Sequence, residues 1–128
     1  MRRLRSCQTG STSVEFAIVS LVMMSAAFGV VEIGRALNVR NQLSQAADFG
    51  SRKVLTNKLI ADSPLEAAVR SAFSAGSASA LTVTLGSETV NGLQFRTIAL
   101  SYAFTPLVKL SSNSRALTLT VSRRTPLI

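Results

Sequence analysis

The chain has 128 residues, with 14 Lys and Arg against 6 Asp and Glu, and its formal net charge is +8. Because it contains no His and a single Cys, it cannot build a His-based acid–base relay, a Cys/His zinc site or an intrachain disulfide. Charged residues make up only 16% of the chain, against roughly 25% in ordinary soluble domains, so some long segment must lack charge.

An apolar segment begins close to the N-terminus. Residues 16–31 carry no charge, and Glu15 and Glu32 bracket them. As a helix they would be about 24 Å long at about 1.5 Å per residue, short of the roughly 30 Å hydrocarbon core of a membrane. Extension to Val14 and Ile33 closes much of that gap but includes both carboxylates. Arginines at three of the first five positions make the pattern typical of an export signal or membrane anchor, and less typical of a core helix in a soluble protein.

Two interpretations of this N-terminus differ in what the mature protein keeps. In one, residues 16–24 form the apolar region of a conventional signal peptide that is cleaved after Ala27. In the other, the helix is retained and residues 11–34 span the membrane. Glu15 weakens the first interpretation, because a carboxylate at the head of the apolar region has no role in a signal peptide and opposes insertion. In both, the arginines keep the N-terminus cytoplasmic and direct the rest of the chain outward.

A helical pattern continues out of the apolar segment and favours the retained helix. Residues recur at spacings of three and four to about Leu55, with no Pro between them. The pairs Glu32/Arg35 and Asp48/Arg52 have the spacing of stabilising ion pairs on one helix face. We therefore expect one long helix whose second half belongs to an outward-facing domain of residues 35–128. The expected stripe comprises Ile33, Ala36, Leu37, Arg40, Leu43, Ala46, Ala47, Gly50 and Val54.

A second, shorter helix is predicted over residues 64–74. Ser63 is the expected N-cap, Pro64 occupies the first helical position, and Glu66 completes a capping box. Leu65, Ala68 and Phe73 would share one apolar face of this helix. Gly76 lies just beyond its expected end.

Beyond residue 80 the apolar period changes to two, which predicts strands. Residues 81–85, 93–104 and 116–122 alternate between apolar and polar side chains, and turn residues fill 86–92 and 111–114. The pattern predicts a three-stranded antiparallel sheet with one apolar face, which the short helix and the second half of the long helix would cover. The expected fold class is α+β.

The start of the chain, combined with this architecture, resembles a known family. Gly10, then small residues, then the pair Glu15-Phe16, is similar to the processing site of type IV pilins and pseudopilins. In those proteins a short basic leader ends in Gly, and Glu is the fifth residue after the cut. With the later segment of residues 101–107 and the terminal strand, the chain most resembles the TadE-like minor pilins of tight-adherence (Flp) pilus systems.

The resemblance implies a structural or assembly subunit of such a pilus. Residues 1–10, with Cys7, would be a leader that a membrane prepilin peptidase removes after Gly10, leaving Ser11 as the new N-terminus, whose amine many pilins methylate. Glu15, next to Phe16, would pair with the N-terminal amine of a neighbouring subunit. The expected partners are the prepilin peptidase, other pilin and pseudopilin subunits, the inner-membrane assembly platform and inner-membrane lipid. The chain would cross the bacterial inner membrane once and carry its C-terminal domain on the periplasmic or extracellular side.

Other function classes find little support in the residues. The six carboxylates are dispersed over helices and a turn, and no Gly-rich phosphate loop, nucleophile elbow or metal-ligand spacing is present. The basic residues are scattered without interleaved aromatics, so no specific nucleic-acid binding is expected. We therefore expect no enzyme activity, no cofactor and no metal. The alternative from another class is an exported envelope protein without a role in a pilus, cleaved after Ala27.

Overall fold

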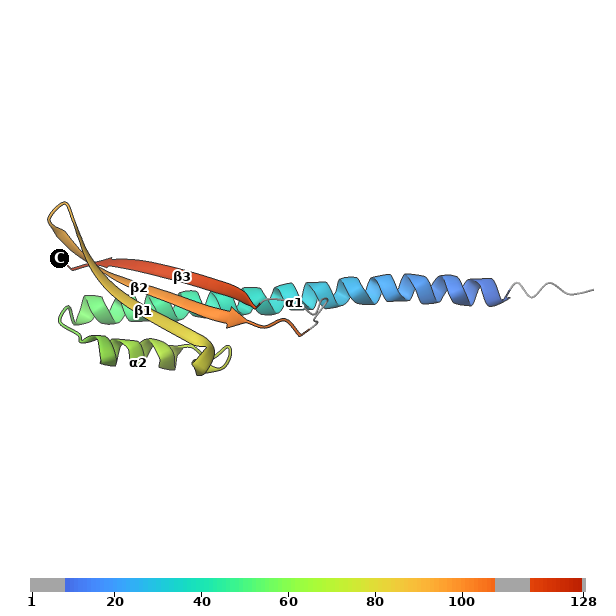
Figure 1. Cartoon of the computed structure of the whole chain (residues 1–128), viewed down its shortest axis with the longest axis horizontal. Coiled ribbons are helices and arrows are strands. Elements are labelled where there is room, and N and C mark those ends of the chain that lie inside the picture. Colours follow the sequence, from blue (N-terminus) through green and yellow to red (C-terminus); the bar gives the residue numbers. More distant parts are fainter. Residues whose placement is uncertain (1–8, 108–115, 128) are drawn as a thin grey trace, which may run out of the picture. The chain divides into compact units, whose positions relative to one another are not determined.

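A computed structural model describes residues 9–107 and 116–127 and has the expected α+β architecture (Figure 1). The described residues form two compact units, divided between Ile33 and Gly34. We call them the apolar unit, residues 9–33, and the sheet unit, the described residues from Gly34 onward. The elements, in chain order, are α1 (Thr9–Thr56), α2 (Asp62–Ala72), the 3-10 turn η1 (Ala78–Ala80), β1 (Leu81–Val90), β2 (Leu93–Phe104) and β3 (Leu117–Pro126).

The second half of α1 buries one stripe of side chains in the sheet unit. The predicted stripe is correct at Ala36, which is partly buried against the core, and from Leu43 onward. It is wrong at Ile33, Leu37 and Arg40, which are exposed, and it omits Val39, which is buried. The spacing from Val39 to Leu43 continues the same helical face, and the charge of Arg40 stays hydrated on another face. The buried residues of α1 are Val39, Leu43, Ala46, Ala47, Gly50 and Val54.

The second helix, α2, begins earlier than the capping pattern predicts. Its N-cap is Ala61, which has extended dihedrals and no side-chain cap, and the N–H of Leu65 donates to the Ala61 carbonyl at 3.3 Å. The predicted capping box at Ser63 is therefore wrong. Pro64 is tolerated in the first turn because N–H groups there have no intrahelical acceptor. The helix ends at Ala72, two residues before the predicted end, and buries Leu65 and Val69.

The sheet is an antiparallel meander in the order β1-β2-β3. The predicted turn over residues 86–92 is too long, because β1 continues to Val90 and pairs there with Leu93. Only Asn91 and Gly92 form the turn, with φ of 52° and 80°. An Asn-Gly pair adopts the two positive φ angles of a tight hairpin turn with little strain, and its twist matches the flanking strands. Strand β3 also runs beyond the predicted residue 122, to Pro126. The turn predicted at 111–114 lies outside the described residues.

One apolar core joins the two helices to the sheet. Ile98 and Leu100 of β2 are fully buried and pack with α1 and α2 in a single cluster. Gly50 of α1 lies close to both α2 and β2. A Cβ atom at Gly50 would be 2.6 Å from Cγ2 of Val69 and 3.0 Å from Cδ1 of Ile98. A residue without a side chain is therefore needed for α1 to pack at this depth.

Gly50→Ala is expected to destabilise the sheet unit, because the new methyl group would overlap Val69 and Ile98. Overpacking of this kind costs typically about 1–3 kcal/mol, of which the better helix propensity of Ala returns up to about 1 kcal/mol. The matched control is Gly34→Ala, since nothing lies within 4 Å of a Cβ at Gly34. Denaturant unfolding of the full chain in detergent, followed by the fluorescence of the single tyrosine, Tyr102, measures both variants. Equal midpoints for the two variants would contradict this packing.

Candidate functional site

The apolar unit exposes its side chains all round the helix. Between Gly10 and Ile33 no described residue is buried, and large apolar side chains there are mostly more than half exposed, as Phe16 is at 73%. A contiguous apolar surface of this kind needs a membrane or a protein partner to cover it. The helix is long and apolar enough to cross a membrane. Its length and its apolar surface suggest membrane anchoring.

Two hydroxyl groups of the apolar unit, those of Ser20 and Ser25, are hydrogen-bonded within the helix. Ser20 Oγ donates to the Phe16 carbonyl at 2.7 Å, and Ser25 Oγ donates to the Leu21 carbonyl at 2.8 Å. A hydroxyl group in hydrocarbon costs free energy unless it is hydrogen-bonded, and these bonds meet that condition without another chain. The serines therefore do not prevent this helix from lying in lipid.

The predicted processing residues lie at the start of α1. Gly10 and Ser11 are exposed in the first turn, and nothing lies within 4 Å of a Cβ at Gly10. The first N–H groups of a helix have no intrahelical acceptor, so the first turn unwinds at little cost, and Gly favours unwinding further. Gly10 and Ser11 are thus exposed at the start of the helix, and the packing of the fold does not require Gly at position 10.

Glu15 lies one helical turn from Ser11, and the structure brings these two predicted site residues together. Ser11 Oγ donates to Glu15 Oε1 at 3.4 Å, and both side chains are exposed. Side chains in a helix lean toward its N-terminus, which directs the Glu15 carboxylate toward residue 11. The structure does not place Phe16 in contact with this pair, and its ring is exposed. A carboxylate at this position can pair with a cation near residue 11.

The carboxylates of the sheet unit from Asp48 onward each pair with an arginine. Asp48, which the sequence pattern pairs with Arg52, accepts a hydrogen bond from Arg123 Nε at 2.7 Å instead. No described residues form a group of three His, Cys, Asp or Glu that could hold a metal ion. Three of these pairs join separate elements, the fourth, Glu66–Arg70, lies within α2, and the four acids do not converge on one cleft. The pairs are Asp48–Arg123, Asp62–Arg96, Glu66–Arg70 and Glu88–Arg124.

Comparison with known families finds a match to the N-terminal helix, which carries the predicted site residues. A family model described as "TadE-like protein" matches residues 10–52, which lie within α1. The N-terminal helix of this chain is therefore similar to that family. The TadE-like match includes Gly10, Ser11, Glu15 and Phe16 and the buried stripe as far as Gly50. The TadE-like family is structural and suggests a Tad pilus-associated protein. No curated protein and no solved structure is significantly similar to the chain.

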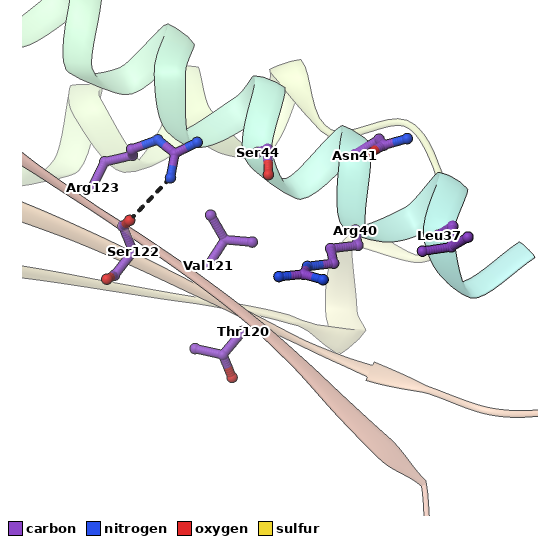
Figure 2. Close-up of a pocket in the computed structure, with 8 residues that line it drawn as sticks. All are labelled: Leu37, Arg40, Asn41, Ser44, Thr120, Val121, Ser122 and Arg123. Carbon is purple, nitrogen blue, oxygen red and sulfur yellow. Dashed lines mark hydrogen bonds between the residues drawn. The ribbon is translucent and has the colours of Figure 1, made fainter. Parts of the chain in front are cut away.

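The sequence pattern did not predict a groove that the structure shows in the sheet unit. It lies between α1 and β3 and has a volume of about 450 Å³ (Figure 2). Its two walls are far apart in the sequence, so only the sheet register and the packing of α1 bring them together. The lining residues are Leu37, Arg40, Asn41, Ser44, Thr120, Val121, Ser122 and Arg123.

If the apolar unit anchors the chain, a charge in its middle should weaken the anchor. Val22→Arg is expected to reduce the share of the protein that stays with membranes after carbonate extraction, because Arg at the centre of a spanning helix costs about 2.5–3.5 kcal/mol. Leu55→Arg is the matched control, since Leu55 is also an exposed α1 residue but lies outside the apolar unit. Anchoring through this segment would be refuted by wild-type protein that extracts completely, or by equal retention of both variants.

Proposed function

We propose that the chain is a minor pilin or pseudopilin of a tight-adherence pilus. In this proposal the prepilin peptidase removes the leader after Gly10, the helix from Ser11 holds the subunit in the bacterial inner membrane, and residues 35–128 face outward. The observation that carries the proposal is the pattern of Gly10, Glu15 and Phe16 at the start of an exposed apolar helix that matches the TadE-like model. The match begins at Gly10, the last residue of the proposed leader.

The position of Glu15 gives the proposal a physical basis. A carboxylate inside an apolar helix bundle is costly unless it is paired, and cleavage after Gly10 would create a cation at the Ser11 amine. In a bundle of subunits shifted along the helix axis, the amine of one copy can reach the carboxylate of the next. The contact of Ser11 with Glu15 supports this, since both residues lie on the same helix face. Methylation of the amine would keep its charge, and so would preserve the pairing.

The proposed partners follow from these surfaces. The apolar unit would pack against lipid, against the helices of other pilin and pseudopilin subunits, and against the inner-membrane assembly platform. Small residues along the helix, such as Ala17, Ser25 and Gly29, would permit close approach of neighbouring helices. In the competing function, that of an exported envelope protein, cleavage after Ala27 would remove Glu15 and most of this surface.

Cleavage after Gly10 is tested by N-terminal sequencing of protein from its native host, which should begin at Ser11. Gly10→Leu is expected to leave the full-length precursor in the membrane, because a bulky residue before the cut obstructs the peptidase without disturbing the packing of the fold. Gly29→Leu is the control, because its Cβ also meets nothing within 4 Å, and processing should be unchanged. A sequence that begins at Phe28 would instead establish the signal peptide.

Glu15→Gln is expected to leave membrane insertion intact and to weaken co-purification with pilin subunits by at least tenfold. The physical reason is that removing one member of a buried ion pair costs about 3–5 kcal/mol, since the other charge is left unpaired. Glu88→Gln is the matched control, because Glu88 is a surface carboxylate of β1 that pairs with Arg124. Quantitative co-purification and counts of assembled pili measure the effect. Normal assembly of the Glu15→Gln protein would refute the pairing role.

A further inference from the structure

Strand β3 has a backbone edge that no other described segment covers. It pairs only with β2, at one side of the sheet. The N–H of Leu127 donates to the Gln94 carbonyl at 2.8 Å, which continues the register that pairs Phe95 with Pro126. In an antiparallel pair the hydrogen-bonded residues alternate, so the odd-numbered residues of β3 bond to β2 and the even-numbered ones point away. We call the outward backbone groups of Thr118, Thr120, Ser122 and Arg124 the β3 edge.

The β3 edge forms one wall of the groove described above, and α1 forms the other (Figure 2). In Figure 2, Arg40 and Ser44 extend from the helix toward the strand, and Val121 extends from the strand toward the helix. The carbonyl of Ser122 receives a hydrogen bond of 3.4 Å from Arg123 Nη1, in agreement with its outward direction. A groove between a strand edge and a helix has the geometry into which an extended peptide adds as a further strand.

The charged residues that line the groove favour an occupant with negative charge. Two arginines line it, and none of its lining residues is a carboxylate. Arg123 is already paired with Asp48, whereas Arg40 pairs with no carboxylate among the described residues. The guanidinium group of Arg40 therefore offers its hydrogen-bond donors to an anionic group inside the groove.

We propose that the β3 edge docks an extended segment of another polypeptide that carries a carboxylate side chain. The backbone of this segment pairs with the outward groups of Thr118, Thr120 and Ser122. Alternate side chains of the segment then point toward α1, where one carboxylate meets Arg40 and its neighbours meet Asn41 and Ser44. This inference concerns a different part of the chain from the anchor and does not rest on cleavage after Gly10.

Two observations favour a different polypeptide over a second copy of this chain. A second copy that paired through its own β3 would bring its Arg40 and Arg123 to the same groove, and the whole chain is already strongly basic at +8. Like charges that meet in this way oppose association. In addition, proteins commonly protect an open strand edge with charged residues or Pro. Arg124 and Pro126 occupy the C-terminal end of the β3 edge, whereas residues 117–122, which line the groove, contain neither a charge nor a Pro. This part of the edge is open to a partner strand.

The test uses the full chain in detergent and three matched peptides. Each labelled peptide has the sequence Thr-Val-Thr-X-Thr-Val-Thr with blocked ends, where X is Glu, Gln or Lys, and fluorescence anisotropy measures its binding. The Glu peptide is expected to bind at least tenfold more tightly than the Lys peptide, with the Gln peptide between them. Arg40→Glu should reverse this order. A version of the Glu peptide with N-methyl groups on every amide, which has no backbone N–H to donate on either edge, should lose binding.

Variants of the edge separate strand addition from simple charge attraction. Thr120→Pro removes an outward N–H and no bond to β2, so it should reduce binding of the Glu peptide at least tenfold. Thr89→Pro is the matched control on the opposite edge of the sheet, where the odd-numbered residues of β1 point away from β2. It should bind as the wild type does. Tyr102 fluorescence reports whether each variant is folded.

Several results would overturn the inference. One is the absence of binding by all three peptides, and another is equal binding of the Glu and Lys peptides. Binding that depends on Arg40 but tolerates both Thr120→Pro and amide methylation would indicate an anion or lipid headgroup site instead. Self-association of the chain that Thr120→Pro abolishes would identify a second copy as the occupant. If Thr120→Pro does not fold, the methylated peptide and Arg40→Glu still decide the outcome.

Discussion

The close approach of α1 to α2 and to β2 around Gly50 is the contact on which the rest of the sheet unit depends. Ala46 and Ala47, one turn earlier on the same face, are fully buried, so small residues bring the helix close to the sheet over more than one turn. The ion pairs that join α1 and α2 to the sheet, Asp48–Arg123 and Asp62–Arg96, involve partly exposed groups. Exposed pairs contribute at most about 1 kcal/mol each. Apolar packing therefore stabilises this unit, and the ion pairs chiefly fix which residues face one another.

This core makes the fold independent of how the N-terminus is processed. The first buried residue of α1 is Val39, well beyond both Gly10 and Ala27. Removal of the residues before either position would leave the buried stripe and every strand in place. The stability of the sheet unit thus does not distinguish a retained anchor from a discarded signal peptide. The difference between them lies in Glu15, a carboxylate that only an assembled, retained helix would use.

The sequence predicted the type of each element because its periodicities are clear, and it failed where local signals competed. Ser63 is a residue type that favours the N-cap position, but Ala61 is the N-cap of α2 in the structure. Asp62, in the first turn of the helix, pairs with Arg96 of β2, a contact that the local sequence does not indicate. The polar residues of 86–90 suggested a turn, although the Asn91-Gly92 pair alone satisfies the geometry of the hairpin. The groove and the arginine partners of the acids join residues that are distant in the chain. Helical and strand periods carry no information about such contacts.

The two edges of the sheet differ in what lies beside them. At the β1 edge, α2 packs beside the strand, and the Leu81 carbonyl accepts a hydrogen bond of 2.8 Å from Arg70 Nη1. Arg70 also binds Glu66 and the Ala78 carbonyl, so one side chain closes that end of the edge. At the β3 edge, among the residues that the structure describes, the hydrogen bond to an outward group comes from the adjacent residue, Arg123. One edge of the sheet thus lies beside α2 and is capped by Arg70, whereas the other lies beside a groove with two arginines, and the proposed docking at the β3 edge rests on this asymmetry.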